Sequence, residues 1–450
     1  MILEILKKRD AKIHFIGVLG AGMYPLFMIL KNAGYSLSGS DAVKTPLFDK
    51  LQASCERVYI GHKGDFVSEA DVVVRSLAVP DSDEEVSLAN SLSVPVISRP
   101  ELLGAIISSF NYSVGVSGSH GKSTVTAMIF EIFIKQGVPA TVACGAEIKS
   151  KHPEIGKDKD VIIAEACEYK DAFLNFFFDS YVFLNLEYDH TDYFTSFDSL
   201  RRSFLLAMKN AQKLIVNKDD PEIYSLAVKS EKDFVTVSVR EMADYEARNI
   251  DSLFGYYSYD LYLKGIFCHR VKLSVPGAFN VTNSLSAIAA ACEFGIDPIL
   301  AADSLNEFSG VGRRLEFIGR LFGRAVYYDY AHHPTEIRAG IEAVREMQGG
   351  SVDVVFRPHT FSRTKSLFGD FASSLSLADR VILLDIDPVR EKYDQSISIN
   401  SLCDKIGEKA CVLEFERVID RLKESSGAII VMGAANLLPL IKEIKNNLEK

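Results

Sequence analysis

Short apolar runs alternate with longer segments of helical period along most of the chain. Because these runs are apolar at consecutive rather than alternate positions, they are typical of strands buried on both faces of a parallel sheet. The predicted strands are Lys12–Gly17, Asp71–Ser76, Val94–Ser98, Tyr112–Ser117, Val161–Ala166, Tyr181–Asn185, Lys213–Asn217, Arg324–Asp329, Val352–Phe356, Arg380–Leu384 and Ala428–Met432. Between them, helices are predicted at Met23–Ala33, Thr124–Gln136, Asn283–Phe294 and Thr335–Met347. This alternation predicts an α/β protein with open, doubly wound sheets.

The chain has 450 residues, and a single hydrophobic core stops growing near roughly 250–300 residues. Three segments that look like the start of a phosphate-loop or Rossmann unit divide it into three predicted domains. They are a Rossmann-like domain over 1–109, a phosphate-loop domain over 110–312 and a second Rossmann-like domain over 313–450. The glycine-rich segment Ser309–Gly312 is the predicted hinge before the third domain. Within the second, Val235–Lys272 is predicted as a set of short strands.

Composition excludes several classes of protein. The net charge is −10 with no dense basic run, which argues against a nucleic-acid or anionic-membrane partner. No run of about 18 apolar residues is present, so no membrane span is predicted. The charged N-terminal segment has no apolar stretch long enough for a signal peptide. Seven cysteines without a C-x-x-C pair predict free thiols in a reducing compartment, and therefore a cytoplasmic protein.

The strongest local motif is Gly118-Ser119-His120-Gly121-Lys122-Ser123-Thr124, between a predicted strand and a predicted helix. Glycines let successive backbone N–H groups converge on phosphate oxygens, and the helix N-terminus adds partial positive charge. Lys122 is expected to reach the β- and γ-phosphates of ATP, and Ser123 to bind magnesium. The usual pattern has glycine where Val116 stands. The alternative is an ordinary glycine turn with a surface lysine.

Polar residues also follow two neighbouring strands. Glu165 ends one strand, and Asp189-His190 follow another. Because ligands of open α/β sheets bind beyond the carboxyl ends of the strands, Glu165 and His190 are candidate ligands of a second magnesium ion. Histidine is an unusual magnesium ligand, so a histidine merely packed at a strand end is the alternative.

Two further polar clusters lie around the start of the predicted third domain. One is Arg313-Arg314, and the other is Asp329-Tyr330-Ala331-His332-His333-Pro334 at a strand end. On its own, the second cluster also fits an ordinary helix start with Pro334 in the first turn.

Together these segments resemble the Mur ligase family. Gly118–Thr124 resembles the ATP loop of that family, and Glu165–Tyr169 resembles its acidic strand-end motif. Asn185–His190 resembles its Asn-x-x-x-Asp-His motif, and Pro276–Asn283 its adenine-side motif. Gly312–Arg314 and Asp329–Glu336 resemble the start of its third domain. The resemblance spans about residues 12–365, in the order of the family.

Three segments are most similar to the alanine-adding members of that family. They are Gly17–Met23, Asp329–Glu336 and Arg357–Thr364. Leu19, Cys167 and Thr360 depart from the common pattern, in which glycine, aspartate and arginine stand at these places. The region around residues 201–203 has no lysine, whereas sister ligases carry a modified one there. This absence also fits the alanine-adding type.

The resemblance implies ATP-dependent ligation of L-alanine to the lactyl carboxylate of UDP-N-acetylmuramate, through an acyl phosphate, in peptidoglycan precursor synthesis. It implies ATP and Mg²⁺ as cofactors, and the number of subunits stays open. Lys122, His190 and Arg363 are the expected catalytic residues. ATP is expected at Gly118, Ser119, His120, Gly121, Lys122, Ser123, Thr124, Asn283 and Arg314; metal at Ser123, Glu165 and His190; and the substrates at Gly22, Met23, Asp41, Ser76, Ala78, His120, Tyr330, His332 and Arg363.

Three other functions remain open on the sequence. The nearest is a ligase of the same family that attaches a preformed tripeptide to the same sugar nucleotide during recycling. An NAD-dependent dehydrogenase is suggested by the first loop, but Leu19 stands where the dinucleotide fingerprint needs its middle glycine. A non-catalytic ATP-binding regulator is the third, against which the presence of Lys122, Glu165, His190 and Arg363 argues.

Overall fold

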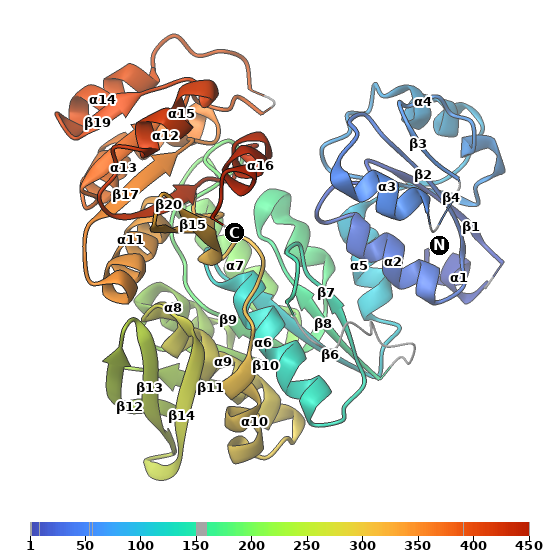
Figure 1. Ribbon diagram of the computed structural model, residues 1–450. Coiled ribbons are helices and arrows are strands. Elements are labelled where there is room, and N and C mark those ends of the chain that lie inside the picture. The colour runs from blue at the N-terminus through green and yellow to red at the C-terminus, as the bar shows by residue number, and fades with distance from the viewer. Residues whose placement is uncertain are drawn as a thin grey trace.

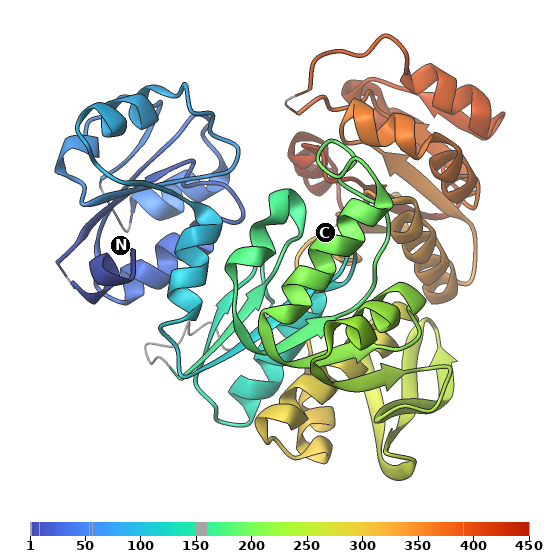
Figure 2. The same ribbon diagram turned by 180° about the vertical axis from the view of Figure 1, so that it is seen from behind.

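The structure is a computed structural model that describes residues 2–8, 10–53, 55, 57–149, 160–389 and 391–449. Its strands form three sheets of five, nine and six strands. Each sheet is the centre of one body, and the first and third bodies lie on opposite sides of the middle one (Figures 1 and 2). Helices cover the sheets, so the predicted α/β class with three domains is confirmed.

The first sheet is parallel, with the strand order β3-β2-β1-β4-β5. The order reverses between β1 and β4, and ligands of such sheets bind at the carboxyl ends of the strands at this point. The elements are α1 Ile2–Lys7, β1 Lys12–Ile16, α2 Tyr24–Asn32, β2 Ser36–Asp41, α3 Pro46–Gln52, β3 Val58–Ile60, η1 Val67–Glu69, β4 Val72–Arg75, α4 Glu84–Ser91, β5 Val96–Ser98 and α5 Arg99–Ile107.

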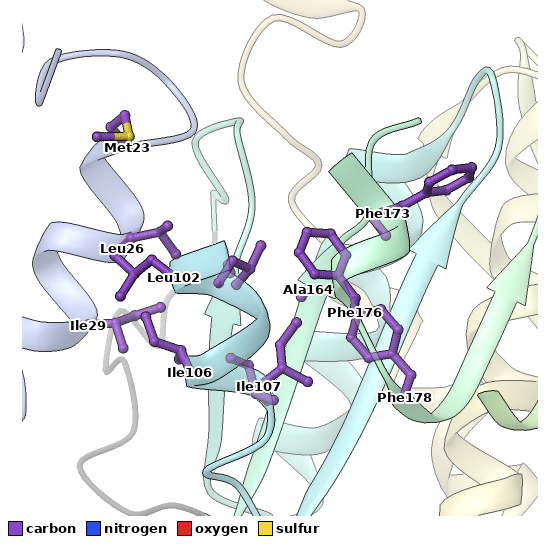
Figure 3. Close-up of a cluster of buried hydrophobic side chains, with 14 of the residues drawn as sticks. Met23, Leu26, Ile29, Leu102, Ile106, Ile107, Ala164, Phe173, Phe176 and Phe178 are labelled. Carbon is purple, nitrogen blue, oxygen red and sulfur yellow. The ribbon is translucent and has the colours of Figure 1, made fainter. Parts of the chain in front are cut away.

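Helix α5 joins the first body to the middle one. It begins with a capping box, in which Ser98 and Glu101 satisfy each other's backbone N–H groups. Leu102 and Ile106 face α2, while Ile107 lies on the side of Ala164 (Figure 3). These side chains are buried in one hydrophobic cluster that continues from the first sheet into the middle domain. Burying each such side chain contributes roughly 1.5–3 kcal/mol, so α5 fixes the two bodies to each other.

The middle sheet has the order β14-β13-β12-β11-β10-β9-β6-β8-β7, parallel from β7 to β12 and antiparallel from β12 to β14. Strand β6, which leads into the glycine loop, lies between β8 and β9. The elements are β6 Tyr112–Ser117, α6 Lys122–Lys135, β7 Ala140–Ala143, β8 Val161–Glu165, η2 Tyr169–Asn175, β9 Phe178–Phe183, α7 Phe197–Lys209, β10 Ala211–Asn217, α8 Pro221–Ser230, β11 Asp233–Ser238, β12 Tyr245–Leu253, β13 Tyr256–Leu263, β14 Ile266–Pro276, α9 Phe279–Phe294, α10 Pro298–Ser304 and η3 Leu305–Glu307.

The third sheet has the order β15-β16-β20-β17-β18-β19, and only its first pair of strands is antiparallel. Its central strands are buried along their whole length, as their continuous apolar sequence predicts. The elements are β15 Glu316–Leu321, β16 Arg324–Asp329, α11 Pro334–Gln348, β17 Val352–Phe356, α12 Phe361–Ser366, α13 Phe368–Leu375, β18 Arg380–Leu383, α14 Ile399–Ile406, β19 Ala410–Val412, α15 Phe415–Leu422, β20 Ala428–Met432 and α16 Leu438–Asn446.

Every strand predicted from an apolar run is present, with ends that shift by up to three residues. Strands β2, β3, β7, β15 and β19 were not predicted from the sequence. Strand β2 gives no apolar signal because its sequence SLSGSD is mostly small and polar, although four of its residues are buried. Helix α9 begins at Phe279, four residues before its predicted start. Among the described residues, no helix combines the length and the apolar character needed to cross a bilayer.

Candidate active site

The loop between β6 and α6 has a backbone that only glycine allows at two places. Gly118 and Gly121 have φ values of 139° and 85°. A Cβ on Gly118 would lie 3.0 Å from the Leu184 Cβ atom, and one on Gly121 would lie 2.7 Å from the Asn283 side-chain oxygen. The loop is therefore both left-handed and closely packed. Helix α6 begins directly at Lys122, so its free N–H groups face the loop.

Asn185, in the segment after β9, holds this loop in place. Its side-chain oxygen accepts a hydrogen bond from the His120 N–H group at 2.7 Å, and its amide donates to the His120 carbonyl at 3.1 Å. The Asn185 carbonyl accepts from Ser119 N–H at 3.0 Å. The first residue of the predicted Asn-x-x-x-Asp-His motif is thus a positioning residue for the glycine loop.

The Lys122 ammonium folds back into the loop. It donates to the carbonyl oxygens of Gly118 and Ser119 and lies 3.1 Å from a carboxylate oxygen of Glu168. Burial disfavours the charged ammonium, but the Glu168 carboxylate outweighs it and raises the pKa of Lys122. The same Glu168 carboxylate lies 3.4 Å from His190 Nε2. Burial disfavours the charged carboxylate, but Lys122 and His190 outweigh it and lower the pKa of Glu168 to about 2. Lys122 is therefore a cation fixed at the loop by its hydrogen bonds and by Glu168.

Ser123 and Glu165 form a second contact at the start of α6. The Ser123 hydroxyl donates to Glu165 Oε2 at 3.1 Å, and the Gly145 N–H group donates to the same oxygen at 3.2 Å. A hydroxyl and a carboxylate are oxygen ligands of the kind that magnesium prefers. This donor set fits the predicted metal. His190 instead lies with Cys167 and Glu168, all within 4.8 Å, so a shared role of Glu165 and His190 stays a prediction.

The His120 imidazole lies between the middle and third domains. Its Nδ1 atom is 3.2 Å from Glu336, at the start of α11, and its Nε2 atom is 3.3 Å from Glu187. Burial disfavours the charged imidazole, but Glu336 and Glu187 outweigh it and raise the pKa of His120 to about 9. His333 and Arg314 also contact these carboxylates, at 3.1 and 3.6 Å. The predicted helix start at Pro334 is thus also part of an interdomain contact.

Tyr330 and His332 lie beside this contact. The His332 Nδ1–H group donates to the Tyr330 carbonyl at 3.0 Å, and burial lowers the pKa of His332 to about 3. The guanidinium of Arg313 lies 4.7 Å from the centroid of the Tyr330 ring. Asp329 accepts hydrogen bonds from Leu315 and Ala331 N–H groups, both at 2.7 Å, and so fixes the turn that carries Tyr330 and His332.

Arg363 on α12 is not free on the surface. Its Nε and Nη2 atoms lie 2.9 and 3.2 Å from the two carboxylate oxygens of Asp189, and both side chains are buried. Nη1 lies 3.1 Å from His359 Nδ1. Thr360 has a φ of 69°, and its hydroxyl caps α12 by accepting a hydrogen bond from the Arg363 N–H group. The predicted ligand Arg363 is therefore anchored across the interface between two domains.

A cavity of about 490 Å³ lies between the middle and third domains. Five residues predicted to bind ATP line it, namely His120, Gly121, Thr124, Asn283 and Arg314. Glu336 of the third domain also lines it, across from His120 of the glycine loop. Its size suits a nucleotide, since small-molecule sites typically range from roughly 300 to 1,000 Å³.

The residues predicted for the nucleotide sugar lie in the first domain at the ends of β1, β2 and β4. Asp41 accepts a hydrogen bond from the Leu19 N–H group at 2.9 Å, and Ser76 accepts one from Ala78 N–H at 3.3 Å. The Met23 side chain packs into the hydrophobic core and is 1% exposed. Gly22 lines a second cavity of about 260 Å³, between the first and middle domains.

Three family models match the chain in order. "Mur ligase family, catalytic domain" matches residues 12–111, "Mur ligase middle domain" 116–291, and "Mur ligase, glutamate ligase domain" 313–435. A curated relative from Caldanaerobacter subterraneus subsp. tengcongensis is 35% identical over 97% of both chains. The chain belongs to the Mur ligase family. That relative and one from Caldicellulosiruptor saccharolyticus, 37% identical over 92% of both chains, are named UDP-N-acetylmuramate–L-alanine ligase.

Solved Mur ligase structures share the fold. The UDP-N-acetylmuramate–alanine ligase of Thermotoga maritima has a TM-score of 0.82 at 24% identity, over 97% of this chain and 98% of that one. A murein peptide ligase of Psychrobacter arcticus has a TM-score of 0.76 at 21% identity, over 98% and 100%. Both matches span all three domains.

Within this Mur ligase fold, the structure adds site residues that the sequence analysis did not select. Asn185 holds the loop, and Glu168 holds Lys122. Glu187 and Glu336 contact His120. All four stood inside the quoted motifs, but a strand-end rule selects the residue at the strand end and not its partner. Glu336 is the N3 residue of α11, so the capping-box pattern was its available signal.

Proposed function

We propose that this chain joins L-alanine to the lactyl carboxyl group of UDP-N-acetylmuramate while ATP is cleaved to ADP and phosphate, as a step of peptidoglycan precursor synthesis. The curated relatives with this name, similar over nearly the whole chain, support the proposal. The observation that carries it is the glycine loop and the start of α6: Gly121 lines a cavity toward the third domain, and Glu165, the partner of Ser123, lines another toward the first. The proposal includes a cytoplasmic location, where both nucleotide substrates are available.

The chemistry requires two successive transfers. A carboxylate oxygen of the lactyl group attacks the γ-phosphorus atom of ATP, and the bond between that phosphorus and the ADP oxygen breaks. The resulting acyl phosphate is attacked at its carbonyl carbon by the alanine nitrogen. The carbon–oxygen bond to phosphate then breaks, and the nitrogen loses a proton. Most of the catalytic work is to hold two anions together and to neutralise the developing charge.

Lys122 and the loop N–H groups are proposed to neutralise the phosphates. In the structure the Lys122 ammonium is held at the loop by Glu168 and by loop carbonyls. Binding of phosphate would replace those carbonyl contacts by stronger charged ones. Ser123 and Glu165, with His190 as a further candidate, would hold magnesium, which supplies additional positive charge beside the phosphates.

Tyr330, His332 and Arg363 are proposed to bind alanine or the acyl intermediate. Arginine has five N–H donors; the bonds to Asp189 use two of them and the contact with His359 Nδ1 a third. The two donors that remain on the guanidinium are proposed to bind a carboxylate. The neutral His332 leaves its second ring nitrogen free to interact with an amine.

A coupled assay of ADP release tests the proposal. Release is expected only when UDP-N-acetylmuramate, L-alanine, ATP and Mg²⁺ are all present, with one ADP for each amide bond detected by mass spectrometry. Faster turnover with L-Ala-D-Glu-diaminopimelate than with L-alanine would identify the recycling ligase instead. A nicotinamide absorbance change without ADP release would identify a dehydrogenase. Binding of ATP without turnover under any of these conditions would identify a regulator.

A further inference from the structure

Arg99, the first residue of α5, has a half-buried side chain that lines the cavity of about 260 Å³ between the first and middle domains. Gly22, Glu165 and Cys167 line the same cavity. No described residue forms a salt bridge or hydrogen bond with the Arg99 guanidinium. Nearly every other buried or half-buried cation near the site has a carboxylate partner, as Lys122 and Arg363 do. Arg99 is thus a cation without a counter-ion at the edge of a cavity.

The position of this side chain is fixed from two sides. Helix α5 is clamped by its capping box and by Leu102 and Ile106, which pack against α2 (Figure 3). The Arg99 stem lies over Gly22, because a Cβ built on Gly22 would be 3.2 Å from Arg99 Cδ and 3.5 Å from Nη1. Gly22 therefore makes room for the arginine.

The electrostatic setting favours an anion. Burial lowers the pKa of Arg99, while Cys167 and Glu165 act in the opposite direction without forming an ion pair. A guanidinium stays charged in proteins, and a half-buried charge without a partner is costly. Helix α2 begins just after Met23 and has no acidic residue in its first turn, so its N-terminus also favours negative charge. Both features face the segment that contains Gly22.

We propose that Arg99 binds the diphosphate group of the nucleotide sugar, through paired N–H donors above Gly22. The proposal rests on the function proposed above. We place the diphosphate here rather than the lactyl carboxylate because Gly22 lies in the loop after β1, at the strand ends where the order of the first sheet reverses and nucleotide ligands bind. Planar, bidentate recognition of phosphate is the usual use of arginine at such a position.

Calorimetric titration with UDP, UMP and uridine tests the assignment. Arg99→Met is expected to weaken UDP binding about 10- to 100-fold, the effect of losing charged hydrogen bonds, and to leave uridine binding unchanged. Arg99→Lys keeps the positive charge but not the paired N–H donors, and should weaken UDP binding less than Arg99→Met does. Arg57→Met is the matched control, since Arg57 lies in the same domain and pairs with Glu69.

The outcomes separate this proposal from the proposed function. Unchanged UDP binding by Arg99→Met would overturn the diphosphate assignment. If that variant bound UDP normally but UDP-N-acetylmuramate weakly, the arginine would hold the lactyl carboxylate instead, which also overturns it. Failure of the unmodified protein to bind UDP would count against the proposed function. ADP binding at the other cavity shows that each variant is folded.

Gly22→Ala gives an independent test. The backbone of Gly22 is not left-handed, so alanine adds only a methyl group that displaces Arg99. UDP binding is expected to weaken in Gly22→Ala and to weaken little further in the double variant with Arg99→Met, since contacting residues are not additive. Fully additive losses would show that Gly22 acts without Arg99, contrary to the proposal.

Discussion

Arg363 donates two hydrogen bonds to the carboxylate of Asp189 and so joins α12 of the third domain to the segment after β9 of the middle domain. Burial disfavours the Asp189 carboxylate, but Arg363 outweighs it and holds the pKa of Asp189 far below its usual range. Asp189 also accepts a hydrogen bond from the N–H group of His190, whose φ is +54°. One ion pair thus fixes both the domain interface and the backbone of a candidate metal ligand.

Asp189→Asn should open this interface. Breaking a buried pair leaves an unpaired cation and costs roughly 3–5 kcal/mol. We expect a lower calorimetric transition temperature and a larger radius of gyration by X-ray scattering. Asp379→Asn is the control, because Asp379 forms a largely exposed pair with Arg345 that is worth at most about 1 kcal/mol. Equal effects of the two substitutions would contradict the role given to Asp189.

Lys122→Ala should abolish phosphate transfer. Removing the cation from the loop is expected to lower kcat at least about 1,000-fold, the upper range for loss of one electrostatic contact to a developing charge. Release of ADP is the measurement. Lys135→Ala, at the other end of α6 and paired with Glu131, should retain activity. Near-normal ADP release by Lys122→Ala would refute the assignment of the loop.

The contact between His120 and Glu336 should weaken at high pH. The pKa of His120 is raised from 6.5 to about 9, so its stabilising effect is complete below pH 6.5 and is lost as pH rises through about 9. The melting temperature of the unmodified protein should therefore fall between pH 6.5 and 9.5 more steeply than that of His120→Asn. If the melting temperatures of the two proteins fell equally with pH, the protonation of His120 would not stabilise the folded protein.

Removal of magnesium should stop turnover, and Glu165 should determine how much Mg²⁺ the reaction requires. EDTA is expected to abolish ADP release, and excess Mg²⁺ to restore it. Glu165→Gln replaces an anionic oxygen ligand by a neutral amide, and should raise the half-saturating Mg²⁺ concentration at least about tenfold. Glu222→Gln, which removes a carboxylate paired with Arg201 away from the loop, should leave it unchanged. Identical Mg²⁺ curves for both variants would exclude Glu165 as a ligand.

The α/β class, the three domains and the glycine loop were readable from the sequence because local signals carry them. Continuous apolar runs such as Val352–Phe356 are strands in almost any context. Gly118 and Gly121 mark a loop that other residues cannot form. Strand β2 was missed since its polar sequence becomes a strand only through pairing with β1, a contact between distant segments.

The partners within the site were less predictable for the same reason. Nothing near Lys122 in the sequence indicates that Glu168, 46 residues away, holds its ammonium. The motif that contains Arg363 suggested a ligand contact, but its ion pair with Asp189 spans 174 residues and two domains. Motifs identify which residues gather at a site, and the fold decides which of them touch.

The core around α5 affects how the protein can be divided for inhibitor studies. A fragment that ends near residue 109 would bring Ile107 into water, since it lies on the side of Ala164 of the next domain, in a hydrophobic cluster that continues into that domain (Figure 3). Screening for compounds that occupy the nucleotide-sugar cavity therefore requires a piece that extends through the middle domain. By contrast, the third domain is joined through the short segment Ser309–Gly312, which makes residue 312 the better place to shorten the protein from its other end.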